Sequence, residues 1–503
     1  EIIAQLTSTL GPEDPDTIEA RYELAWTYRY AGQYADAIAV HEKIIAQLTS
    51  TLGPEHTDTI KARNELARTY HRAGQYADAI AVHKEIIAQL TSTLGPEHPD
   101  TIEARYELAW TYRYAGQYAD AIAVHEEIIA QLTSTLGPEH PDTINARNEL
   151  ARTYHQAGQY ADAITEHEEI IADLTNTHGP QHPDTIRARN QLASVYCLAK
   201  QYADAITMYQ EIIADLTNTH GPQHLDTIKA RDELTLTYRY AGQYADAIAV
   251  HKAIIADLTN ILDPQHPDTI RARENLASTY HRAGQYADAI AVHKEIIAQL
   301  TSTLGPEHPD TIEARYELAW TYRYAGQYAD AIAEHEEIIA DLTDTHGPQH
   351  PDTIRARNQL ASVYCVAKQY ADAITMYQEI IADLANTHGP QHPDTIKARN
   401  ELAWTYRYAG QYADAVAVHE EIIAQLTSTR GPEHPDTIKA RDELASTYQR
   451  AEQYAKAIAI FEATLADCIT GLGRDNSLTK TVRKNLEAAR QELKQQEEDS
   501  AAE

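Results

Sequence analysis

The chain has 503 residues, too many for one compact core, because single hydrophobic cores stop growing at roughly 250–300 residues. A formal net charge of −33 argues against nonspecific attraction to DNA or anionic membranes. Three cysteines (Cys197, Cys365 and Cys468) are too few for a disulfide framework, which favours a reducing compartment and a cytoplasmic location. No apolar run reaches the roughly 20 residues of a spanning helix.

The chain begins inside a pattern that recurs later. Residues 1–6 are identical to residues 85–90, which lie in the middle of an apolar helical pattern. We therefore interpret residues 1–10 as the truncated second helix of a preceding repeat. On this interpretation we expect more sequence upstream, including an effector domain of the same polypeptide.

Residues 11–473 contain eleven repeats of 42 residues. A Gln-Tyr pair recurs at this spacing from Tyr34 to Tyr454, with no insertion or deletion. A Gly-Pro pair recurs at the same spacing from Gly11 to Gly431, and only Asp263 replaces its glycine. A fixed period of this length is typical of a stacked repeat protein, in which each unit contacts its neighbours.

Each repeat predicts two helices. In the first repeat, residues 16–31 place apolar or small side chains at i, i+3, i+4 and i+7 spacing, and residues 34–51 do the same. Asp100 to Glu103 of a later repeat form a capping-box pattern. Gly32 stands where a residue in the left-handed conformation ends the first helix, and Gly53-Pro54 ends the second. Neighbouring pairs must stack to cover both apolar stripes.

The repeat resembles a known family through a set of recurring residues, namely Leu24, Ala25, Tyr28, Gly32, Gln33, Tyr34, Ala37 and Ile38. This pattern is similar to the tetratricopeptide repeat signature. The 42-residue period and the linker at residues 94–101 resemble the kinesin-light-chain type. The resemblance implies an all-α fold, a right-handed superhelical solenoid of antiparallel helix pairs. It also implies that first helices line a concave groove that binds peptides or protein surfaces.

One row departs from the family pattern. Every repeat has Arg early in the first helix, beginning with Arg21, where the family often has a large apolar residue. The arginine either pairs with acids of adjacent turns, such as Asp36, or contacts a ligand, and we favour the pairing.

The C-terminal residues differ from the repeats. The last repeat has Glu452 in place of the turn glycine, and a highly charged segment with few apolar residues follows. We expect a C-terminal capping helix over residues 474–495, because a polar end helix protects an open solenoid interface. Residues 496–503 are predicted to be a disordered acidic tail.

Differences among the copies concentrate at five positions of the first helix, those of Glu19, Tyr22, Trp26, Arg29 and Tyr30. Their spacing places them on one face, apart from the packing stripe. The resemblance makes this face the groove wall. The candidate partner-binding residues are Tyr22, Trp26, Arg29, Tyr30, Asn64, Arg68, His71, Arg72, Tyr106, Trp110, Arg113, Tyr114, Asn148, Arg152, His155, Asn190, Arg239, Tyr240, His281, Arg282, Tyr316, Trp320, Arg323, Tyr324, Asn400, Trp404, Arg407 and Tyr408.

The composition of this face favours recognition over relaxed drift on a solvated surface. Drift would enrich Lys, Glu, Ser and Gln, whereas Trp, Tyr and Arg dominate protein-binding hot spots. The five positions carry 17 basic and six acidic residues in an acidic chain, which predicts a basic, aromatic groove for an acidic partner segment. Nucleic acid, stacked on the same aromatic residues, is a weaker alternative that the net charge opposes.

Other chemistry is not favoured by the sequence. Histidines recur at 42-residue spacing, unlike helix-borne metal pairs, so we expect no metal site and no cofactor. Those at His71, His155 and His281 lie on the variable face and are candidates for hydrogen bonds to a ligand. Cys197 and Cys365 are interpreted as copied passengers, with a reactive thiol as the alternative. No catalytic constellation stands out, so we predict a binding domain and no enzyme.

The favoured role is the recognition or sensor arm of a larger signalling or effector protein. A static adaptor or scaffold is the alternative. Self-association is a third possibility, since matching repeats can stack end to end.

Overall fold

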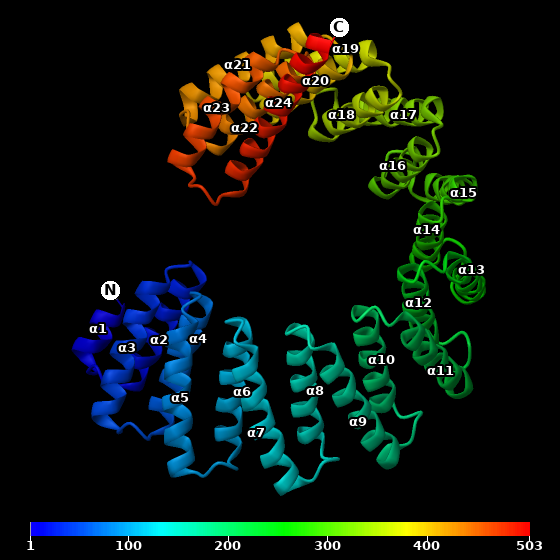
Figure 1. The fold of residues 1–503 in the computed structure, drawn as a ribbon. Helices are drawn as coiled ribbons and strands as arrows, with labels where there is room; N and C mark the ends of the chain where they lie inside the picture. Colours follow the sequence, from blue (N-terminus) through cyan, green and yellow to red (C-terminus); the bar gives the residue numbers. More distant parts are fainter. Residues whose placement is uncertain (1, 503) are drawn as a thin grey trace. The chain divides into compact units, whose positions relative to one another are not determined.

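A computed structural model describes residues 2–502, with side chains described through residue 499. The described residues form 24 α-helices and no strand (Figure 1). In chain order the helices are α1 (Ile2–Thr9), α2 (Pro15–Tyr30), α3 (Tyr34–Thr51), α4 (Thr57–Arg72), α5 (Tyr76–Thr93), α6 (Pro99–Tyr114), α7 (Tyr118–Leu136), α8 (Pro141–Gln156), α9 (Tyr160–His178), α10 (Pro183–Leu198), α11 (Tyr202–His220), α12 (Leu225–Tyr240), α13 (Tyr244–Ile261), α14 (Pro267–Arg282), α15 (Tyr286–Leu304), α16 (Pro309–Tyr324), α17 (Tyr328–His346), α18 (Pro351–Val366), α19 (Tyr370–Thr387), α20 (Pro393–Tyr408), α21 (Tyr412–Arg430), α22 (Pro435–Arg450), α23 (Tyr454–Gly471) and α24 (Ser477–Ala502).

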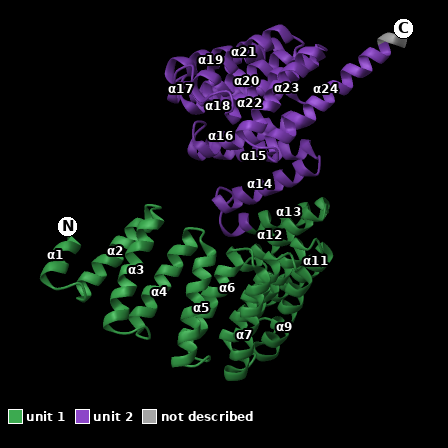
Figure 2. Ribbon diagram, turned by 60° about the vertical axis from the view of Figure 1, so that its left-hand side comes forward, with its two compact units in different colours: residues 1–257 green, residues 258–503 purple. Residues whose placement is uncertain are grey.

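The chain divides into two compact units, Glu1–Asp257 and Leu258–Glu503 (Figure 2). Within each unit, first helices of the repeats (even-numbered from α2 to α22) alternate with second helices (odd-numbered). Each helix packs on the next from α1 to α12 and from α14 to α24. In each unit taken by itself, the first helices lie on the inner side of its curve and the second helices on the outer side (Figure 1). The predicted helix-pair solenoid is therefore what each unit builds.

The first helices are capped by a residue that the sequence pattern did not indicate. His98 precedes α6, and its Nδ1 accepts the backbone N–H of Asp100 at 3.2 Å. The Thr101 hydroxyl instead donates to the Gly95 carbonyl at 2.9 Å, which ties the helix to its linker. The capping box predicted at Asp100 to Glu103 is thus wrong, because the helix begins earlier and the linker histidine, not Asp100, accepts a free backbone N–H of the first turn.

The turns confirm the role predicted for glycine. Gly32 ends α2 with φ +74°, and Lys200 and Lys368 adopt φ +61° at the equivalent point of their repeats. The glycine before the linker proline has φ near +90°, as at Gly53 with φ +91°. Asp263 takes φ +127° there, which is costly for a residue with a Cβ.

The core consists of small and branched apolar side chains that recur in each repeat. Ala25, Ala37 and Ile44 are fully buried, and Leu48 is nearly so. Ile44 and Leu48 of α3 pack against Ala62 of α4, so the apolar stripe of a second helix is covered by the next repeat. Each large buried side chain contributes roughly 1.5–3 kcal/mol to this stacking.

A row of histidines lies within this core. His41 and its equivalents on seven other second helices are buried, and neither ring nitrogen of His41 or His125 has a hydrogen-bond partner. Desolvation lowers the pKa of these imidazoles to about 4, so they are neutral near pH 7. Tyr209, Tyr377 and Phe461 take the same place in the other repeats.

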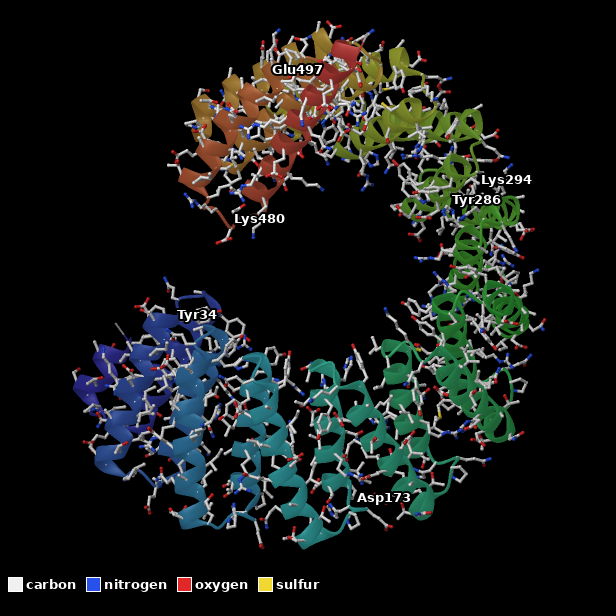
Figure 3. All side chains as sticks on the ribbon, viewed as in Figure 1. Tyr34, Asp173, Tyr286, Lys294, Lys480 and Glu497 are labelled. Atoms are coloured by element: carbon white, nitrogen blue, oxygen red, sulfur yellow. The ribbon has the colours of Figure 1, made fainter. Side chains whose placement is uncertain are left out.

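Most arginines of this row bond to the second helix of their own repeat, but farther along that helix than expected. Arg147 of α8 donates to three carboxylates of α9, Glu166 at 2.5 Å, Glu169 at 2.7 Å and Asp173 at 2.7 Å (Asp173 is labelled in Figure 3). Pairing with acids is therefore confirmed for this arginine. The partner suggested by Asp36, in the first turn of the second helix, is wrong, because the guanidinium reaches the second helix one to three turns farther along.

The C-terminal helix closes the second unit. Val482, Leu486 and Ala489 of α24 are buried against the face of α23 that carries Phe461. The helix continues to Ala502, beyond the predicted end at 495, and only residue 503 lies outside the described part. Residues 496–502, for which we predicted disorder, are thus helical here. An ion pair one turn apart, Lys494 with Glu498 at 3.4 Å, lies in this part of the helix.

Candidate functional site

The predicted partner-binding residues differ in how accessible they are. The exposed ones are Trp26, Tyr30, Arg68, Arg72, Tyr114, Arg152, Tyr240, Arg282, Trp320, Tyr324 and Tyr408. Those of intermediate exposure are Tyr22, Arg29, Asn64, Tyr106, Trp110, Asn148, His155, Asn190, Arg239, His281, Arg323, Asn400, Trp404 and Arg407. His71, Arg113 and Tyr316 are buried.

The exposed part consists mainly of aromatic pairs one turn apart on the first helices. Trp26 and Trp320 expose 49% and 47% of their surface, although large apolar side chains are usually covered. The Trp26 ring lies 4.3 Å from the ring of Tyr30, and the Trp320 ring lies 4.9 Å from that of Tyr324, between centroids. These pairs form ready-made apolar platforms with polar rims.

The row of Arg29 contacts the next repeat. Arg29 Nη1 donates to Glu65 at 2.9 Å, Arg113 Nη1 to Glu149 at 2.9 Å, and Arg407 Nη1 to Glu443 at 3.0 Å. The expectation that this row stands free for a ligand is therefore wrong at these three arginines. They join neighbouring first helices, which the sequence could not show because the pairing depends on how the repeats stack.

The histidines and cysteines of the same row are also packed between repeats. The His71 ring stacks on Trp110 with centroids 4.0 Å apart, and burial lowers the His71 pKa. Cys365 Sγ lies 3.3 Å from Thr405 Oγ1 of the next first helix. Burial raises the pKa of the Cys197 and Cys365 thiols, which disfavours the thiolate and supports the passenger interpretation.

A row of glutamates was missed by the sequence interpretation. Glu65, Glu107 and Glu149 follow the position of Tyr22 by one residue and line the same hollow as Arg68 and Trp110. With this row the face carries 17 basic and 14 acidic residues, so its charge is far more balanced than the five variable positions indicated. The row recurs one turn after the position of Glu19, and this spacing could have placed it on the face.

Two hollows on this face share one construction. The first, of about 600 Å³, is bounded by Arg68, Trp110 and Arg113, with His125 among its lining residues. The second, of about 430 Å³, lies in the other compact unit and is bounded by Trp320, Arg323 and Gln359, with His335 among its lining residues. Both hollows are lined by an indole, a guanidinium and a buried imidazole. The arrangement suits recognition of a side chain rather than covalent chemistry.

The described residues contain no cluster of three or more His, Cys, Asp or Glu side chains placed to hold a metal ion. Within the same part of the chain, no helix has the length and apolar character needed to cross a membrane. Its three cysteines are free thiols.

A model of the tetratricopeptide repeat matches most of the chain, at residues 31–92, 58–134, 114–176, 154–218, 184–260, 236–302, 268–344, 324–382, 352–428 and 409–470. The chain belongs to the tetratricopeptide repeat family. Repeats of this family form binding surfaces for protein partners, so this array is a protein-interaction domain. No curated protein of similar sequence was found.

Solved structures with similar repeats include those of a Podosopora anserina protein assigned as a kinesin light chain. One of them is 29% identical, covers 41% of this chain and 98% of that one, and has a TM-score of 0.36. BtubC of P. vanneervenii is 19% identical over 46% of this chain and 94% of its own (TM-score 0.34). Yeast Tom70 is 12% identical over 95% and 96% (TM-score 0.32).

Proposed function

We propose that the inner face of the tetratricopeptide array binds a segment of a partner protein through its Trp–Tyr pairs. One observation carries the proposal. The four tryptophans of the chain, Trp26, Trp110, Trp320 and Trp404, all occupy the same position of the repeat. In other repeats this position holds Ser, Arg or Leu, so the fold does not require an indole there. Exposed Trp and Tyr are the residues that most often anchor partners.

We keep the preference for an acidic segment within this proposal, but we expect it to contribute less to the affinity than the sequence suggested. Glu65 and Glu149 neutralise arginines of the face, and Arg187 pairs with Asp184 at 3.0 Å on its own helix. We therefore expect the aromatic platforms to supply most of the affinity. The charge of the partner would matter only where a cation lacks an internal partner. The role of a sensor arm joined to an upstream domain stays a prediction from the sequence.

Tryptophan fluorescence tests the proposal, because no indole lies elsewhere in the chain. Peptides selected on the intact chain from a random display library, and synthesised without tryptophan, should shift or quench the protein's emission as they bind. Binding that saturates in calorimetry while the emission stays unchanged would place the peptides on another surface and contradict the proposal.

A further inference from the structure

One residue of the neighbouring repeat, the one that meets the arginine, sets one of the four Trp–Arg repeats apart from the other three. In three of them the arginine three residues after the tryptophan donates to a glutamate on the next first helix, as Arg407 does to Glu443. After Trp320, the equivalent glutamate is replaced by Gln359. The carboxylate that accepts from the arginine elsewhere is therefore missing from this copy.

Arg323 consequently has weak internal partners. Its Nη1 lies 3.4 Å from the Ser362 hydroxyl, and its guanidinium lies 5.5 Å from the centroid of the Trp320 ring. Within the described residues it makes no ion pair, whereas Arg355, which lines the same hollow, pairs with Asp352 at 3.2 Å. A half-buried guanidinium without a carboxylate leaves strong, geometrically fixed donors unused.

Two acidic residues line the same hollow, Glu313 and Glu317 of α16. They precede Arg323 by ten and six residues, which places them about 15 and 9 Å away along the helix axis at a rise of about 1.5 Å per residue. The end of the hollow at Gln359 and Ser362 is thus the end where Arg323 dominates the field.

From this difference we infer that the Trp320–Arg323 hollow receives a carboxylate side chain, Asp or Glu, of the partner segment. The partner's carboxylate takes the place that Glu65, Glu149 and Glu443 occupy in the other three copies. Ser362 and Gln359 add neutral donors, and Trp320 covers the adjoining aliphatic part. The inference rests on the proposed function and names one contact within it.

Substitutions that copy the residue found in a sibling repeat provide matched variants for the test. Gln359→Glu restores the internal carboxylate found in three sibling repeats, so the fold tolerates it. Glu443→Gln does the reverse at Trp404, where Ser446 stands in the place of Ser362. The Trp404 copy also has Lys397 and Asn400 where the Trp320 copy has Glu313 and Tyr316, so it lacks the acid at Glu313. Full-length chains with a single tryptophan, made by Trp→Phe at the other three, report each hollow separately.

The probe is a capped peptide of alternating Glu and Gly, compared with capped Gln-Gly and with Gln-Gly that has a free C-terminus. We expect the Glu peptide to change Trp320 emission at concentrations ~10-fold or more below those needed by capped Gln-Gly, since charged hydrogen bonds are worth that much. Gln359→Glu and Arg323→Gln should each weaken this binding by a similar factor. Glu443→Gln should create it at Trp404.

Equal binding to Gln359→Glu and to the parent chain would overturn the inference. So would binding of the free C-terminus without binding of the Glu side chains. Neither result would decide the proposed function, because that proposal is tested by whether selected peptides alter the emission of the four tryptophans.

Discussion

Individual side chains show where a sequence pattern is sufficient and where it is not. Gly32 and its equivalents were predictable, because one residue's φ decides the turn. The partners of Arg147 and Arg29 were not, because they lie on a later turn of the second helix or on the next repeat. Such pairs depend on the rotation of one helix against another, which a period alone does not specify. The Glu65 row could have been placed on the face from its spacing, but it was not counted among the variable positions, because eight of its eleven copies are glutamate.

The buried Arg147 network gives a prediction at this scale. Arg147→Met should destabilise α8 and α9 by about 3 kcal/mol, because Glu166 would keep a mostly buried carboxylate without its cation. Arg147→Met with Glu166→Val should recover most of the loss, since valine occupies the position of Glu166 in repeats such as the third, at Val124. Hydrogen exchange of α8 and α9 measures the local opening free energy. A double variant as unstable as the single one would contradict the account.

Asp263 gives a second residue-scale prediction. Its φ of +127° is suited to glycine, although its carboxylate recovers part of the cost by accepting the Gln265 amide at 2.7 Å. Asp263→Gly should raise the stability of α14 and α15 by about 1 kcal/mol. Gly305→Asp, with φ +98°, is the converse control and should lower stability at its own linker. Thermal unfolding measures both changes, and a destabilised Asp263→Gly variant would refute the strain.

The positions of the helices were predicted more accurately than any other feature of the fold. The expected segments 16–31 and 34–51 correspond to α2 (Pro15–Tyr30) and α3 (Tyr34–Thr51). Their ends were accessible because Gly and Pro mark them in the sequence. The His98 cap was not, because an imidazole nitrogen is an unusual acceptor for a helix start. The burial of His167 could not be predicted either, because a polar residue next to an apolar stripe can equally lie at the exposed edge of that stripe.

The buried histidines predict how these helices respond to acid. The pKa of His167 is about 4 in the folded chain because burial disfavours its charge, against an ordinary value of 6.5. The unfolded chain therefore binds the proton first, and stability is lost as pH falls from 6.5 towards 4. One such imidazole costs about 3 kcal/mol below pH 4.

Tyrosine provides the matched control for this prediction. His167→Tyr should remove the acid sensitivity of α8 and α9, because Tyr209 occupies the same place one repeat later and is likewise buried. The first helices of the two repeats also carry asparagine at the same position, Asn148 and Asn190. Hydrogen exchange of the two helices at several pH values measures the difference. Equal pH dependence in the variant and the parent would show that the buried imidazole is not responsible.

For the chain as a whole, the repeat family and the helix-pair fold were predictable, whereas the charge of the binding face was not. A 42-residue period over eleven copies leaves few architectures other than a stack of helix pairs. The predicted groove charge omitted the row of Glu65, Glu107 and Glu149, in which glutamate stands in eight of the eleven repeats. Of the eleven predicted partner-binding residues that are exposed, seven are aromatic, and recognition by this array is proposed to depend on them.

Replacing all four tryptophans with serine tests that dependence most directly. Serine stands at this position in several native repeats, such as Ser194 and Ser362, so the variant should fold. Peptides selected on the parent chain should bind the variant at least ~100-fold more weakly, measured by calorimetry. Leu136→Ser with Leu304→Ser, at exposed ends of second helices, should leave the affinity unchanged. Undiminished binding to the tryptophan-free chain would contradict recognition by the inner face.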